Sequence, residues 1–148
     1  MRMNNSDLTL ILVDDDPAHS TLIKRNLLKC GLTNNLISLN SGQQLLDYVF
    51  AKGQYKNRPT PQKVLILLDI NMPGINGIEV LKTLKATELT CKIPVYMLTT
   101  TDEPTEIDEC FRLGCNAYLI KPIEHEEFAK KIQQLGKFLM LNHIPQFL

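Results

Sequence analysis

The apolar residues of this chain gather into short continuous runs, separated by longer segments of mixed polarity. Runs of this length predict strands that are buried on both faces of a sheet. Five such strands are predicted, at Leu8–Val13, Leu36–Asn40, Val64–Asp69, Val95–Thr99 and Ala117–Ile120.

The segments between these runs carry the start signals of helices. Asp16 stands before Pro17, which is the usual order of an N-cap and a first helical residue. Ser41 and Asn76 begin sequences similar to a capping box. A fourth helix is predicted to open within 101–104 and to end near Gly114, and a fifth runs from about 124 to about 141. The apolar face of that last helix is formed by Phe128, Ile132, Leu135 and Leu139.

Strict alternation of strands and helices predicts a parallel sheet with helices on both faces. With five strands, the predicted fold is α/β and flavodoxin-like, a doubly wound (βα)5 domain of strand order 2-1-3-4-5. We expect one domain over residues 1–148, with 1–7 as a flexible N-terminal tail and 142–148 as a C-terminal extension. In this order the first and third strands are neighbours, so the residues that follow them converge.

Carboxylates stand at the ends of these two central strands. Asp14 and Asp15 come directly after the first run, and Asp69 closes the third, ahead of a loop at 70–74. Ligands of open α/β sheets bind at this edge. Converging carboxylates repel each other unless a cation neutralises them, and a site made of oxygen ligands suits Mg²⁺. These loops contain no cysteine or histidine, which counts against zinc.

The other strand ends supply donors for a phosphoryl group. An aspartate beside Mg²⁺ is a competent nucleophile toward phosphorus. The transferring group develops charge on three equatorial oxygens, and each needs a donor. Thr99 closes the fourth run and Lys121 follows the fifth, so a hydroxyl and an ammonium are available at the same edge.

Together these residues resemble the receiver domain of two-component response regulators. The resemblance extends over nearly the whole chain. It is carried by Asp14-Asp15, by LLDINMPGING from Leu67 to Gly77, by LTT from Leu98 to Thr100 and by GCNAYLIKP from Gly114 to Pro122.

The resemblance implies that Asp69 is the phosphoacceptor, taking a phosphoryl group from a histidine of a partner kinase. Asp15 would bind Mg²⁺ directly, Asp14 would bind it through water, and Asn71 would offer its backbone carbonyl. Asp69 and Lys121 would be the catalytic pair, so the chain would assist its own phosphorylation and dephosphorylation without being an enzyme in the ordinary sense.

The resemblance also assigns the residues that read the phosphoryl group. Thr99, with Thr100 beside it, would bind a phosphoryl oxygen, and Lys121 would pair with the group from the other side. Tyr118 takes the position of the aromatic switch residue that turns inward. The Lys121–Pro122 bond is expected to be cis.

Composition narrows the class of protein further. The formal net charge of the 148 residues is zero, which argues against a nucleic-acid-binding module. No apolar run approaches the roughly 20 residues that span a bilayer, and the first residues do not form a signal peptide. The four cysteines form no CxxC pair and are expected to be buried thiols. A cytoplasmic location is predicted.

The expected output is a protein contact, because too few residues follow Lys121 for an output domain. The apolar segments 138–141 and 144–148 predict either packing onto the same domain or a homodimer. The homodimer would use the fourth helix, the fifth strand, the fifth helix and the C-terminal tail. The loop GQYKNRP, the stretch IPVYMLTT and this tail resemble stand-alone regulators of bacteriophytochrome-type histidine kinases, which are small homodimers.

Two other classes share parts of this pattern. A haloacid-dehalogenase-type phosphatase also uses a strand-end aspartate with Mg²⁺, but it needs a second aspartate where this chain has Asn71, and a cap domain. A flavodoxin that binds FMN is disfavoured because the acidic first loop would repel a phosphate without a metal.

Overall fold

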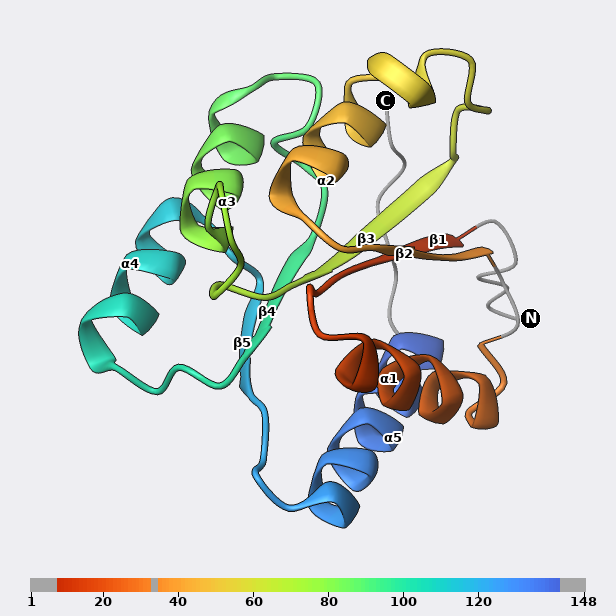
Figure 1. The fold of residues 1–148 in the computed structure, drawn as a ribbon, viewed down its shortest axis with the longest axis vertical. Coiled ribbons are helices and arrows are strands. Elements are labelled where there is room, and N and C mark those ends of the chain that lie inside the picture. The colour runs from red at the N-terminus through yellow and green to blue at the C-terminus, as the bar shows by residue number, and fades with distance from the viewer. Residues whose placement is uncertain (1–7, 33–34, 142–148) are drawn as a thin grey trace.

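The computed structural model describes residues 8–32 and 35–141, so the predictions for 1–7 and 142–148 lie outside the described residues. The sheet is parallel, with strand order β2-β1-β3-β4-β5, and the predicted flavodoxin-like fold is confirmed. Helices α2, α3 and α4 cover one face of the sheet, and α1 and α5 cover the other (Figure 1). The elements are β1 (Leu8–Val13), α1 (Pro17–Lys29), β2 (Asn35–Leu39), α2 (Gly42–Val49), the 3-10 turn η1 (Gly53–Tyr55), β3 (Lys63–Leu68), α3 (Gly77–Ala86), β4 (Val95–Thr99), α4 (Pro104–Leu113), β5 (Ala117–Ile120) and α5 (His125–Leu141).

Strands β2 and β3 each lie one residue earlier than predicted. Both pair with β1, and the register of those pairs sets their ends: Val13 is opposite Leu39 on one side and Leu68 on the other. Asp69 therefore stands just beyond β3, although its N–H still donates to the Val13 carbonyl at 3.1 Å. Pairing with the central strand, rather than apolarity alone, decides where these strands stop.

The core consists of two layers, one on each face of the sheet. All six residues of β1 are buried, and they alternate between the layers. Ile11 and Val13 pack toward α2, α3 and α4. Leu10 and Leu12 pack toward α1 and α5, where the four predicted apolar residues of α5 are all buried. Because the strands are buried on both faces, the positions of their ends are fixed. The residues that follow the strands are therefore fixed in place as well.

The helix starts follow the predicted caps. The side chains of Asp16, Ser41 and Asn76 accept backbone N–H groups of α1, α2 and α3, as N-caps do. Helix α4 begins at Pro104 after Glu103, whose side chain makes no capping bond. Gly114 ends α4 with a φ of 106°, a left-handed conformation that favours glycine.

The prediction of four buried thiols is wrong for two cysteines. Cys110 and Cys115 are buried, but Cys30 and Cys91 are partly exposed, and all four are free. Cys30 is the C-cap of α1 and Cys91 lies in the turn after α3, where the chain reaches the surface. Within the described ranges, no helix is long and apolar enough to cross a membrane.

Candidate functional site

Three charged side chains from three strand ends meet at the carboxyl edge of the sheet. Asp14 follows β1, Asp69 follows β3 and Lys121 follows β5. Their residues are only 3%, 8% and 3% exposed. Because β1 and β3 are paired neighbours whose last residues face each other, the two aspartates are brought side by side. Buried charges of this kind persist only when they neutralise one another.

The Lys121 ammonium has an acceptor for each of its three N–H groups. Its Nζ lies 2.5 Å from Asp14 Oδ2 and 3.1 Å from Asp69 Oδ2. The third neighbour is Nδ1 of His19, at 3.1 Å. The cation is therefore held between two carboxylates and an imidazole, with little access to water.

Asp14 is the most strongly constrained of the acids. Its Oδ2 faces Lys121, and its Oδ1 accepts the backbone N–H of Asp16 at 2.9 Å. Burial raises the pKa of the Asp14 carboxyl, while the hydrogen bond from Lys121 acts in the opposite direction. This carboxylate is fixed in place on both of its oxygens.

Asp15 completes an oxygen-lined cluster at the surface. It is exposed, and one carboxylate oxygen each from Asp14, Asp15 and Asp69 lies within 4.8 Å of the other two. Oxygen donors alone, in this number, fit a hard divalent cation. Asp16 does not belong to the cluster, because its Oδ1 accepts the N–H groups of Ala18 and His19 as the cap of α1.

The mouth of the site is bordered by three linked side chains. Nδ2 of Asn71 donates to Oγ1 of Thr101 at 2.8 Å, and the Tyr118 hydroxyl donates to the Thr101 carbonyl at 2.7 Å. Thr99 is fully buried and its Oγ1 accepts the Thr101 N–H at 3.4 Å, whereas Thr100 is exposed. Thr101 thus connects the loop after β3 to β5.

Tyr118 is partly buried, with its hydroxyl turned toward that loop. Burial raises the pKa of the Tyr118 phenol to about 12. It therefore stays neutral and able to donate throughout the physiological range.

Close packing behind Asp69 holds the loop that follows β3. The Gly77 N–H donates to the Ile70 carbonyl at 2.9 Å. A Cβ at Gly77 would lie 2.2 Å from the Asp69 carbonyl oxygen, so only glycine permits this approach. The Asn76-Gly77 pair in the sequence is the local signal for this turn onto α3.

One expectation about the site is corrected. The Lys121–Pro122 bond is trans, since residues 8–32 and 35–141 contain no cis peptide bond. The lysine reaches the carboxylates nonetheless, because its N–H donates to the Thr99 carbonyl and so continues the pairing of β5 with β4. His19 also contacts Lys121, although it was not among the predicted site residues. Nothing in its sequence neighbourhood signals this contact, which depends on how α1 crosses the sheet.

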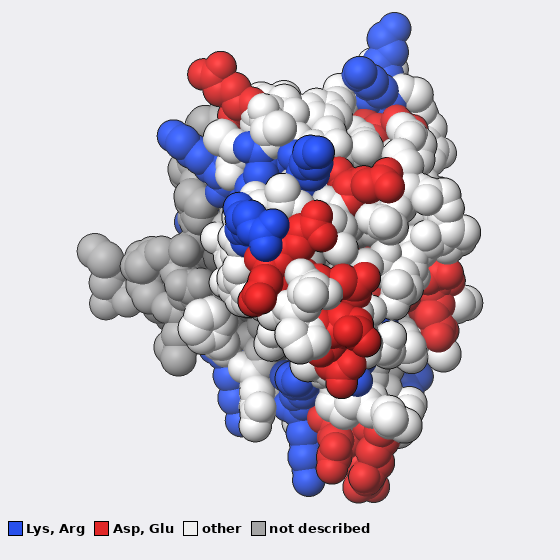
Figure 2. Space-filling view, turned by 90° about the vertical axis from the view of Figure 1, so that its left-hand side faces the viewer, with Lys and Arg blue, Asp and Glu red and all other residues white. Residues whose placement is uncertain are grey.

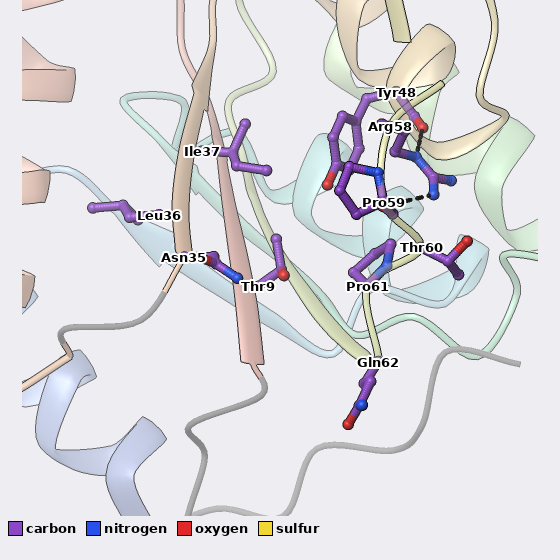
Figure 3. A pocket seen from close by; sticks show the side chains of 10 residues that line it. All are labelled: Thr9, Asn35, Leu36, Ile37, Tyr48, Arg58, Pro59, Thr60, Pro61 and Gln62. Atoms are coloured by element: carbon purple, nitrogen blue, oxygen red, sulfur yellow. Dashed lines mark hydrogen bonds between the residues drawn. The ribbon is translucent and has the colours of Figure 1, made fainter. Parts of the chain in front are cut away.

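A cavity of about 670 Å³ lies at the opposite, amino edge of the sheet (Figure 3). It lies between the starts of β1 and β2 and the segment 58–62, beside Tyr48. Arg58 on its wall donates from Nε to the Tyr48 carbonyl at 2.7 Å and from Nη2 to the Val49 carbonyl at 3.1 Å. The guanidinium thus closes the end of α2, and the cavity shares no residue with the carboxylate cluster.

Known proteins resemble this chain over most of its length. The family profile described as "Response regulator receiver domain" matches residues 10–133. The response regulator Rcp1 of Synechocystis sp. is 32% identical over 135 residues, which span 91% of this chain and 90% of Rcp1.

Solved structures agree with this match. A receiver domain from Rhodospirillum rubrum superposes with a TM-score of 0.87 at 37% identity, covering 94% of this chain and 98% of that one. The Mn²⁺-bound form of Rcp1 has a TM-score of 0.87 at 31% identity, covering 93% and 98%. The phosphorylated cyanobacterial phytochrome response regulator RcpA has a TM-score of 0.85 at 28% identity, covering 93% and 97%. Fold, strand-end chemistry and sequence therefore agree, and the chain belongs to the response regulator receiver domain family.

Proposed function

We propose that this chain accepts a phosphoryl group on Asp69 from a partner histidine kinase, in a reaction that requires Mg²⁺. The observation that carries the proposal is the Lys121 ammonium held between Asp14 and Asp69, with the exposed Asp15 beside them. A buried lysine paired with two carboxylates can change partners when one of them is modified. This exchange of partners would convert the phosphorylation of Asp69 into a conformational change.

In the proposed reaction a carboxylate oxygen of Asp69 attacks phosphorus. A bond forms between that oxygen and phosphorus, and the bond from phosphorus to the donor breaks. Asp15, Asp69 and the Asn71 carbonyl would bind Mg²⁺ directly, and Asp14 would bind it through water. The bound ion would supply charge stabilisation for the phosphoryl oxygens. Lys121 and the Thr99 hydroxyl, with Thr100 beside it, would donate to the remaining oxygens. Tyr118 would follow Thr99 inward when the loop around Thr101 moves.

The test uses acetyl phosphate as donor and intact-protein mass as readout. The wild type should gain one phosphoryl group with Mg²⁺ and none with a chelator, and Asp69→Asn should gain none. Asp16→Asn is the matched control, because Asp16 caps α1 and lies outside the cluster, so this variant should still be modified. A phosphoryl group on Asp69→Asn would refute the assignment.

We propose a histidine kinase of the phytochrome type as the partner, on the basis of the similarity to Rcp1 and RcpA. The chain would act in the cytoplasm, as one receiver domain over 1–148 without binding nucleic acid or membrane. Phosphotransfer profiling against purified kinases of several sensor classes tests the partner. Preferential transfer from a kinase of another class would contradict it.

We further propose a homodimer through α4, β5 and α5, to which the C-terminal tail would add. Exposed apolar side chains support it: Ile120 is 37% exposed, Phe138 53% and Met140 39%. Acidic side chains gather over α4 on the side seen in Figure 2, whereas α5 carries lysines at 130, 131 and 137. In a twofold interface the acids of one copy could face the lysines of the other.

Sedimentation measures this association. Phe138→Glu should shift the chain toward monomer, and truncation after residue 141 should weaken the dimer. Leu89→Glu is the control, because Leu89 is 43% exposed but lies in the turn after α3. Equal masses for wild type and Phe138→Glu would contradict the interface.

A further inference from the structure

His19 lies on the first turn of α1, and its ring faces the buried cation of the site. Its Nδ1 is 3.1 Å from Nζ of Lys121, closer than it is to any carboxylate oxygen nearby. The acids are farther, with Asp16 Oδ2 at 3.6 Å and Asp14 Oδ2 at 3.9 Å. We infer that His19 is a positioning residue whose Nδ1 accepts a hydrogen bond from Lys121 and aims its ammonium at Asp69. The inference rests on the proposed phosphorylation of Asp69.

The chemistry of the two groups decides which of them donates. An ammonium has three N–H donors and no lone pair, so at 3.1 Å the imidazole nitrogen must be the acceptor. A protonated ring would place a second cation against a buried one. The contact is therefore a hydrogen bond from the Lys121 ammonium to the Nδ1 lone pair of His19.

Packing holds the ring in this position from two sides. The ring of Phe128 on α5 lies 5.5 Å away, centroid to centroid, at an angle of 58°. The backbone N–H of His19 donates to Asp16 Oδ1, at the start of the same helix. Because Phe128 is itself buried, α5 and α1 together fix the distance from His19 to Lys121.

The partners of the three N–H groups of Lys121 show what the contact with His19 does. Asp14 and His19 occupy two of the three N–H groups of Lys121, and the third points to Asp69. When Asp69 carries a phosphoryl group, the third donor must find a phosphoryl oxygen. An ammonium anchored at two points can rotate little, so its remaining N–H is already directed there. Without His19 it is anchored only by Asp14, and we expect phosphorylation to slow about tenfold.

The experiment compares two substitutions of similar size. In His19→Asn, Oδ1 takes the position of Nδ1 and keeps an acceptor. In His19→Leu, a side chain with the branched shape of asparagine offers no acceptor. With acetyl phosphate and Mg²⁺, His19→Leu should be modified about tenfold more slowly than wild type, and His19→Asn within about twofold. Thermal unfolding of both variants checks that they are folded alike.

A second readout needs no phosphorylation. The ammonium of a buried, fully bonded lysine gives a slowly exchanging ¹H–¹⁵N signal, assigned to Lys121 by its loss in Lys121→Ala. This signal should persist in His19→Asn and broaden or vanish in His19→Leu. Equal rates and unchanged signals in both variants would overturn the inference. If the wild type took up no phosphoryl group, the proposed function would fail, while the ammonium signal would still decide whether His19 holds Lys121.

Discussion

Two cations sit at opposite edges of the same sheet, and their partners differ in kind. Lys121 at the carboxyl edge is bound by the side chains of Asp14, Asp69 and His19. Arg58 at the amino edge is bound by the backbone carbonyls of residues 48, 49 and 59. Its Cζ also lies 5.1 Å from the centre of the Tyr48 ring. Both cations are satisfied, but only one of them has partners that can be chemically changed.

This difference distinguishes Arg58, which only stabilises the fold, from Lys121, whose proposed role is to respond to phosphorylation of Asp69. A backbone carbonyl keeps its charge and position as long as the chain is folded, so Arg58 can only hold α2 to the segment before β3. A carboxylate can be phosphorylated, and its lysine must then respond. The cavity of about 670 Å³ lies beside Arg58, whereas the proposed chemistry lies beside Lys121.

The largest effect is expected at Lys121. Lys121→Ala leaves two neighbouring buried carboxylates without their cation, which should lower the free energy of unfolding by roughly 3 kcal/mol in the absence of metal. Mg²⁺ should still bind and recover part of this loss. Phosphorylation by acetyl phosphate should slow at least about tenfold, because a donor to the phosphoryl oxygens is gone. Chemical denaturation with and without Mg²⁺, and intact mass against time, measure both effects.

An effect on stability alone is expected at Arg58. Arg58→Ala removes three hydrogen bonds to carbonyls and should cost about 2 kcal/mol in chemical denaturation. Its rate of phosphorylation should equal that of the wild type. Arg58→Lys is the control, since it keeps the charge but loses the planar fork, and it should recover only part of the stability. A slowed phosphorylation in Arg58→Ala would break the distinction between the two cations.

The smallest effect is expected at Tyr118, which borders the candidate site. Tyr118→Phe loses the hydrogen bond to the Thr101 carbonyl, at a cost of about 1 kcal/mol near neutral pH. The pKa of Tyr118 is raised to about 12 in the folded chain, against about 10 when unfolded. The contribution of the Tyr118 hydroxyl to the free energy of unfolding is therefore complete below about pH 10 and is lost as the pH rises toward 12. Denaturation curves of both proteins should converge over that interval, and a constant gap would contradict the prediction.

Much of this site could be predicted from the residues that follow the apolar runs in the sequence. Asp14, Asp69 and Lys121 each follow a short apolar run, and the parallel order of the strands brings their side chains together. The fold and the cluster therefore followed from periodicity and from the order of a doubly wound sheet.

Contacts that depend on how helices and loops lie over the sheet were not predictable in this way. His19 reaches Lys121 because Phe128 on α5 supports its ring, across more than a hundred residues of sequence. Arg58 finds the carbonyls at the end of α2 only after the loop between them has folded. The trans Lys121–Pro122 bond likewise differs from the expectation carried over from the family.

The central claim is that Asp69 carries the phosphoryl group, and chemical trapping tests it most directly. The wild-type chain is phosphorylated with acetyl phosphate and Mg²⁺, reduced with borohydride, digested and mapped by mass spectrometry. An acyl phosphate is reduced to an alcohol, so the account predicts homoserine at position 69 and unchanged aspartate at positions 14, 15 and 16. Homoserine at position 14 or 15, or no reduced residue in a chain that had gained a phosphoryl group, would contradict it.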